Sequence, residues 1–222
     1  MPRRNRTRTT STNGHGSGDW SIRSAGKSQQ IRRNVAVEAA RIMATEGQRS
    51  YMTAKRKAAE RLSVNPRSAL PSNREIDEEL RTYQGLYGGE KHRLQLQLLR
   101  QTAVTVMNRL ERYTPRLVGP VLEGTADGHS RITLHLFNDP PEEIMLHLQE
   151  LGVDYHQEQR RIRWHDGGHR TVQLLVTDLD EAVVELALFN ILDLRQAPPS
   201  PVDGRPQKRA TRIEVENLLD RT

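Results

Sequence analysis

The chain contains no cysteine, no long apolar run and, in its first 28 residues, only one acidic side chain. Without cysteine the protein has no disulfide, no thiolate metal ligand and no cysteine nucleophile. No run of about 18 apolar residues is present, so the sequence predicts no membrane-spanning helix. The amino terminus lacks the apolar segment of a signal peptide. We therefore expect a cytoplasmic protein with no membrane partner, whose oligomeric state stays open.

Residues 1–28 carry six basic side chains against Asp19, which is +5 of the formal net charge of +6. The basic isoelectric point belongs mostly to this segment, so it does not indicate that the whole chain binds nucleic acid. The segment is rich in Ser, Thr, Gly and Arg and has no helical or strand period, which predicts a disordered basic tail. Two interpretations are open: a solubilising extension, or a weak, salt-sensitive contact with RNA or DNA.

Residues 29–113 predict a helical domain of four helices. Apolar residues at helical spacing predict a first helix that ends at Gly47. Thr53 is the expected N-cap of the second helix, and Ser72 or Asn73 that of the third. The fourth helix is the longest, and its predicted buried stripe consists of Leu94, Leu98, Leu99, Ala103, Val106, Met107, Leu110 and Tyr113.

Residues 114–222 predict a small mixed β-sheet domain. Pro115 ends the helical half, and the short apolar or alternating runs that follow are typical of strands. The predicted order is two strands, a helix closed by Gly152, three strands, and a final helix over residues 208–220. Helices first and strands afterwards indicate an α+β protein.

The stretch GPVLEGTADGHSRITLHLF, residues 119–137, predicts a glycine turn followed by a strand. This arrangement resembles the core of the polymerase-β-type nucleotidyltransferase superfamily over residues 116–195. In that superfamily, backbone amides of the turn approach nucleotide phosphates, and two carboxylates on one face of the next strand hold Mg²⁺. In this chain the two carboxylate positions are Arg131 and Thr133.

The chain also resembles, over residues 35–210, a group of proteobacterial proteins with a nucleotidyltransferase-like region. The shared segments include AKRKAAERL, LPSNREI and GPVLEGTADGHS. Both resemblances together imply a nucleotidyltransferase-like fold. They also imply a nucleotide or phosphate site formed by Gly119, Gly124, Thr125, Ser130, Arg131, Thr133 and His135.

Arg131 and Thr133 are poor ligands for Mg²⁺, so the site is expected to bind a nucleotide or an RNA phosphate without a metal or other cofactor. Arg131 offers a planar fork for phosphate. If the protein is active, the resemblance implies an Mg²⁺-dependent nucleotidyltransferase, although no catalytic residue is identified. Asp127 is expected to form a turn, and His129 and His135 are expected to face solvent.

A basic strip is predicted on the second helix, formed by Lys55, Arg56, Lys57 and Arg61. It is expected either to contact a nucleic acid or to be a solvated face offset by the acidic third helix. Residues 35–64 also resemble a helix-turn-helix, although two prolines follow where a recognition helix is needed. The alternative function is therefore a DNA-binding regulator whose α+β domain senses a ligand or forms a dimer.

Overall fold

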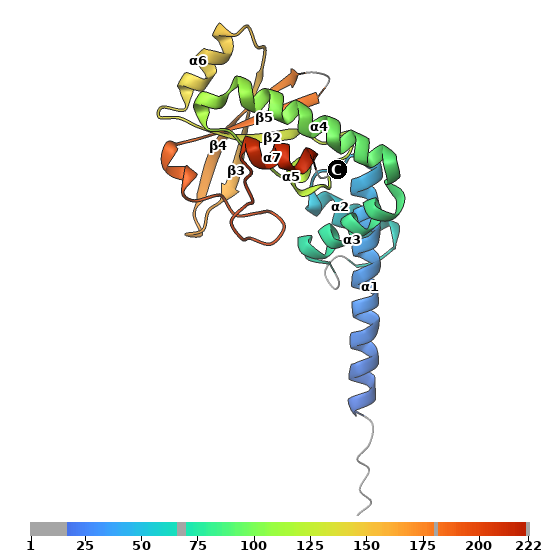
Figure 1. Ribbon diagram of the computed structural model, residues 1–222. Coiled ribbons are helices and arrows are strands. Elements are labelled where there is room, and N and C mark those ends of the chain that lie inside the picture. Colours follow the sequence, from blue (N-terminus) through green and yellow to red (C-terminus); the bar gives the residue numbers. More distant parts are fainter. Residues whose placement is uncertain (1–16, 66–69, 180–181, 221–222) are drawn as a thin grey trace, which may run out of the picture.

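The computed structural model describes residues 17–65, 70–179 and 182–220. In these ranges a group of helices precedes a mixed five-stranded sheet (Figure 1), which confirms the predicted α+β class. The helical part comprises α1 (Ser17–Glu46), α2 (Tyr51–Arg61), α3 (Asn73–Tyr87), α4 (Gly89–Arg109) and the 3₁₀ helix η1 (Glu111–Tyr113). The sheet part comprises β1 (Arg116–Val118), α5 (Pro120–Glu123), β2 (Ile132–Phe137), α6 (Glu142–Glu150), β3 (His156–Arg163), β4 (His169–Leu179), β5 (Ala182–Phe189), η2 (Ile191–Leu194) and α7 (Arg212–Leu219).

The first helix begins earlier than the sequence predicts. Because α1 starts at Ser17, residues 17–28 of the expected tail are helical, whereas residues 1–16 lie outside the described part of the chain. Residues 26–30 are all exposed. Extending a formed helix costs little compared with nucleating one, so a segment without an apolar stripe can continue a helix whose later turns are packed.

The start of α2 also differs from its prediction. Ser50 is the N-cap, and its hydroxyl accepts a hydrogen bond from the Thr53 amide at 3.3 Å. The predicted cap at Thr53 is therefore three residues late, because both residue types can cap and Ser50 stands where its oxygen reaches the third amide. For α3, Ser72 is the cap as predicted, and Glu75 completes a capping box with it.

The apolar core of α1, α2 and α3 is separate from the core that α4 shares with the sheet. Residues such as Val35, Ala58 and Ile76 form the core of α1, α2 and α3. The buried residues of α4 belong instead to the core that it shares with the sheet. Figure 1 shows α4 running from the helical group across the sheet.

The predicted stripe of α4 is only partly correct. Leu99, Ala103 and the later apolar positions are buried, but Leu94 and Leu98 are 52% and 53% exposed. The helix turns a different side toward the sheet in its first half, where Leu96 is buried instead.

The sheet has the order β1-β2-β5-β4-β3, and β2 and β5 are parallel neighbours in which Thr133 lies opposite Glu185. One face of β2 packs into the core with α4. The opposite face of the sheet carries Thr133, His135, Phe137, Glu185, Ala187 and Phe189. The predicted first strand stops at Val118, because Gly119, with φ of +71°, turns the chain into α5.

No helix in the described ranges is both long and apolar enough to cross a membrane.

Candidate functional site

A cleft of about 450 Å³ lies between the helical part and the sheet. Its helical wall includes Arg49, Tyr51 and Asp77, and its floor includes Thr133 and Glu185. This volume is within the range of small-molecule sites. The cleft is therefore the first place to look for a ligand.

Five of the seven predicted site residues line the cleft, namely Gly119, Thr125, Ser130, Arg131 and Thr133. Gly124 is not among the cleft residues, and its carbonyl lies 3.1 Å from Nε2 of His92 on α4. His135 is not among them either, because it lies two residues further along β2 than Thr133. The structure thus brings most of the predicted set together.

Four charged residues form an ionic cluster. Arg131, Arg160 and Glu185 line the floor of the cleft, and Glu158 pairs with Arg131. Glu185 is 2% exposed and accepts from Arg131 at 3.2 Å and from both terminal nitrogens of Arg160, at 2.8 and 2.7 Å. Arg131 also donates to Glu158 at 3.1 and 3.2 Å, and this hydrogen bonding raises the pKa of Arg131. Arg131 is therefore held in an ion-pair network, which its isolated position in the sequence does not reveal.

The floor does not suit Mg²⁺. Glu185 is the only carboxylate on the β2–β5 pair within the cleft, and both of its oxygens already accept from guanidinium groups. Mg²⁺ prefers several oxygen ligands in an octahedral arrangement, and two cations at its single carboxylate would repel it. Among the described residues, no three His, Asp or Glu side chains converge as a metal site.

Ser130 and Asp127 are engaged in the turn between α5 and β2. The Ser130 hydroxyl donates to Oδ1 of Asp127 at 2.8 Å, and the His129 amide donates to the same oxygen at 2.9 Å. Ser130 also accepts from the Asp127 amide at 2.9 Å. The predicted turn at Asp127 is confirmed, and its hydrogen bonds use much of the capacity of Ser130.

The expectation that His135 faces solvent is wrong, whereas His129 is exposed as predicted. His135 is 4% exposed, and Arg209 Nε donates to its Nδ1 at 3.1 Å. Burial, together with the charges of Arg209 and Arg160, lowers the pKa of His135 to about 3. Alternation along β2 suggested that this face is exposed to solvent. The aromatic ring of Phe189 instead packs against the His135 ring, with 4.6 Å between the ring centroids.

The helical wall is joined to the sheet part by three side chains of α3 that donate to backbone carbonyls. Arg81 donates to the Glu123 carbonyl at 3.0 Å, and Gln84 donates to the Thr125 carbonyl at 2.7 Å. Asn73 donates to the Pro201 carbonyl at 2.6 Å. These contacts hold α3 against the turn that forms the edge of the cleft.

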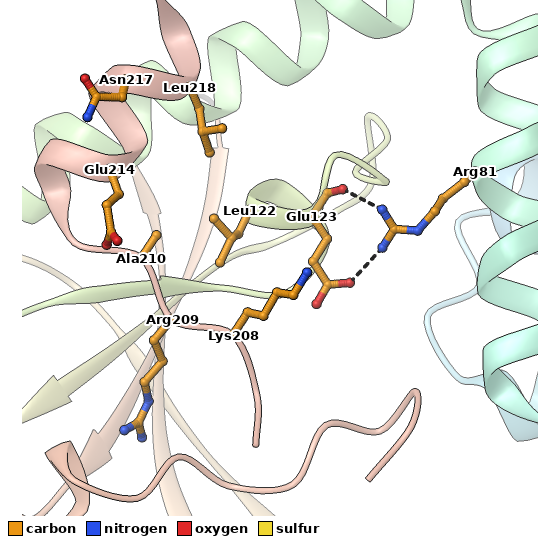
Figure 2. Close-up of a pocket in the computed structure, with 9 residues that line it drawn as sticks. All are labelled: Arg81, Leu122, Glu123, Lys208, Arg209, Ala210, Glu214, Asn217 and Leu218. Carbon is orange, nitrogen blue, oxygen red and sulfur yellow. Dashed lines mark hydrogen bonds and ion pairs between the residues drawn. The ribbon is translucent and has the colours of Figure 1, made fainter. Parts of the chain in front are cut away.

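A second pocket, of about 550 Å³, lies behind this joint (Figure 2). Figure 2 shows Arg81 reaching from α3 to both the carbonyl and the carboxylate of Glu123, with Lys208 pointing toward the same side chain. Burial and the nearby charge of Asp77 raise the pKa of Glu123, against the opposing effect of Arg81 and Lys208. Glu123 is therefore a partner in the joint between the two parts of the chain.

The predicted basic strip of α2 is largely offset. Lys55 is 8% exposed and so does not lie on an open strip, and burial lowers its pKa. Lys57 pairs with Glu46 of α1 at 3.6 Å. Arg61 pairs with Glu46 and also with Glu38.

The ion-pair partners of Lys57 and Arg61 therefore lie on the preceding helix, α1. The sequence had suggested partners on the third helix. Arg56 is exposed and forms no ion pair with any described residue. A free positive charge on α2 is thus confined to a small part of the predicted strip.

The helical wall of the cleft was not identified from the sequence. Tyr51 donates to Asp77 at 3.3 Å, and Arg81 donates to the other oxygen of Asp77 at 2.9 Å. Asp77 and Arg81 are four residues apart on α3, but Tyr51 comes from α2, so no local spacing joins the three. The one available signal was an aromatic residue beside basic residues at the start of α2.

No protein-family model, curated protein or solved structure matches this chain. Function is therefore inferred from the cleft and its chemistry.

Proposed function

We propose that the cleft binds the phosphates of a nucleotide, or of an RNA end, without metal-dependent nucleotidyl transfer. The observation that carries this proposal is the ionic cluster, which places two guanidinium groups against one carboxylate within the cleft lining. Arginine binds phosphate through paired, charge-assisted hydrogen bonds. On the resemblance to nucleotidyltransferases, Arg131 and Thr133 stand where a metal-dependent enzyme needs carboxylates, and Arg160 reaches the same floor from β3.

The cluster leaves donor capacity for an anion. The Arg160 side chain is 50% exposed, so it can present nitrogens to the cleft as well as to Glu185. The Glu158 side chain is 37% exposed, and an incoming phosphate can replace it on Arg131 because water can then solvate the released carboxylate. Both steps keep Glu185 paired, which matters because an unpaired buried charge is costly.

The remaining charges of the cleft also favour an anion. Arg49 is exposed, lines the cleft and forms no ion pair with any described residue. The other acidic residues of the cleft are engaged: Asp77 with Tyr51 and Arg81, Glu123 with Arg81, and Asp127 in its own turn. For an RNA end, exposed Arg56 on α2 supplies a further charge outside the cleft. A cytoplasmic location, where nucleotides are abundant, belongs to the same proposal.

The helix-turn-helix alternative receives less support. The residues that follow α2 do not continue directly into a helix, since α2 ends at Arg61 and α3 begins at Asn73. The first residue of α3 donates to the Pro201 carbonyl, and Arg74 pairs with Glu78 on the same helix. A recognition helix needs a free amino-terminal end to reach base edges, and this end of α3 is docked against the sheet part.

The test is thermal unfolding of the full chain with each nucleoside triphosphate, in chelator and separately in Mg²⁺. A ligand that binds only the folded state, present at about 100 times its dissociation constant, adds about 2.7 kcal/mol of stability. We expect a rise in Tm without Mg²⁺ that is reduced in Arg160→Ala and kept in Arg56→Ala, which removes the same charge outside the cleft. Arg160→Ala leaves Glu185 paired with Arg131, so the variant is expected to fold.

Two results would contradict the proposal. If no nucleotide raises the Tm, the cleft is not a nucleotide site. If the rise requires Mg²⁺, metal-free binding is wrong.

A further inference from the structure

A third cavity, of about 580 Å³, continues from the cleft along the same face of the sheet. We call it the sheet pocket. It shares Thr133, Arg160 and Gln207 with the cleft, so the two cavities meet at these residues. Its floor is apolar and includes Leu174, Ala187 and Phe189. The residues that line it include no carboxylate, in contrast to those of the cleft.

His135 gives the sheet pocket one fixed hydrogen-bond donor. Its Nδ1 accepts from the Arg209 guanidinium, which always carries protons, so in the neutral imidazole the proton must lie on Nε2. Nε2 has no hydrogen-bond partner among the described residues, although His135 is 96% buried and lines the pocket. Because His135 lines the pocket, a ligand acceptor there would give Nε2 a hydrogen-bond partner.

The junction adds polar groups that can adapt. The side chains of Thr133 and Gln207 form no hydrogen bond with the described part of the chain, and each can donate or accept. Beyond them the pocket has an apolar floor and is also lined by the exposed residues Arg161 and Arg163. The centroid of the Phe189 ring lies 4.6 Å from that of His135. The pocket therefore suits a ligand that is flat and apolar on its faces and has hydrogen-bonding atoms on its edge.

We propose that the sheet pocket binds the base of the nucleotide whose phosphates lie in the cleft, with His135 Nε2 donating to an acceptor on the base. This inference rests on the proposed function and adds where the base lies and which group contacts it. A nucleobase has flat faces for the apolar floor and a ring nitrogen or carbonyl for the fixed donor. Arg160, at the junction, is placed to contact the first phosphate or the sugar.

A purely aliphatic ligand fits these observations less well. An alkyl chain would cover the apolar floor but would leave the His135 donor without a hydrogen-bond partner. A free phosphate would contact Arg160 but would leave the apolar floor of the pocket uncovered. The combination of a neutral donor with an apolar floor is what favours a base.

The test is calorimetric titration of the full chain with a nucleoside triphosphate, the matching nucleoside and inorganic tripolyphosphate. We expect the triphosphate of at least one base to bind at least about tenfold more tightly than tripolyphosphate. Ala187→Leu adds bulk to the pocket floor and should abolish this difference while leaving tripolyphosphate binding unchanged. Val183→Leu is the matched control, because it enlarges an exposed residue on the same face of β5 outside the pocket.

The outcomes separate the two proposals. If every nucleotide binds no better than tripolyphosphate, or if Ala187→Leu folds and binds nucleotides as the wild type does, the base does not lie in the sheet pocket, although the phosphate site stands. If a nucleoside binds and tripolyphosphate does not, the sheet pocket stands and the phosphate proposal fails. If none of the three binds, both proposals are wrong.

A second measurement does not depend on how Ala187→Leu folds. The Nε2 resonance of His135 can be assigned in the NMR spectrum of protein with ¹⁵N-labelled histidine, because it is absent from the spectrum of His135→Gln. Addition of the nucleoside to the wild-type protein should shift this resonance. A nucleoside that binds without moving this resonance overturns the contact with His135.

Discussion

Acidification should destabilise the protein through His135 in particular. The imidazole is buried against Phe189 and accepts from Arg209, so the folded protein keeps it neutral, with its pKa lowered to about 3. In the unfolded chain its pKa is about 6.5. Between these two pH values, His135 binds a proton in the unfolded state but stays neutral in the folded state. Stability is therefore fully present above pH 6.5 and is lost as the pH falls toward 3.

The size of the effect follows from the pKa difference. Each unit of pH below 6.5 removes about 1.4 kcal/mol, so His135 alone should lower the free energy of unfolding by about 2 kcal/mol between pH 7 and pH 5. The positive charges of Arg209 and Arg160 add to the effect of burial, because both disfavour a positive charge on the imidazole ring.

Urea denaturation at pH 7 and pH 5 measures this difference. The variant His135→Gln retains an acceptor for Arg209 but does not titrate, so it should lose about 2 kcal/mol less than the wild type on acidification. His129→Gln is the control, because His129 is exposed and its replacement should leave the pH dependence as it is. If wild type and His135→Gln lose the same stability between the two pH values, His135 is not held neutral and the reasoning from its burial is wrong.

Two further predictions concern the fold. Leu134→Ala should cost about 2–5 kcal/mol in urea denaturation because it opens a cavity in the sheet core, whereas Leu94→Ala should change stability by less than about 0.5 kcal/mol because Leu94 is 52% exposed. Equal losses would mean that α4 packs through its predicted stripe after all. Ser50→Ala should cost about 1 kcal/mol and Thr53→Ala much less, because Ser50 is the N-cap of α2. The reverse order of these losses would return the cap to Thr53.

Local sequence patterns predicted the helices and strands better than they predicted which of these elements pack against one another. The end of α3 at Gly88, the strand over residues 132–137 and the final helix follow from breakers, alternation and caps, and the structure has each of them. The pairing of Thr133 with Glu185 depends on the parallel β2–β5 contact across about fifty residues of chain, which no local pattern specifies. The burial of His135 depends on that same pairing, because it sets Phe189 beside the ring.

The part of the candidate site that lies within one local stretch was also predictable, whereas the contacts between distant segments were not. The residues that line the cleft from one continuous stretch, between Gly119 and Thr133, could be found from the turn and the strand. The helical wall could not, because Arg49 reaches the cleft from the loop between α1 and α2, and Asp77 reaches it from α3. Arg131 was identified as a residue of interest, but its two carboxylate partners lie on β3 and β5, far along the chain.

The joint between α3 and the sheet part has a consequence for how the protein can vary. Asn73, Arg81 and Gln84 each donate to a backbone carbonyl, and every residue type has such a carbonyl. Side chains on the receiving segments can therefore drift without undoing the joint, whereas a change at any of the three donors removes a contact that no neighbour can restore. Related sequences should be restrained at these three positions of α3 and freer at the positions that receive them.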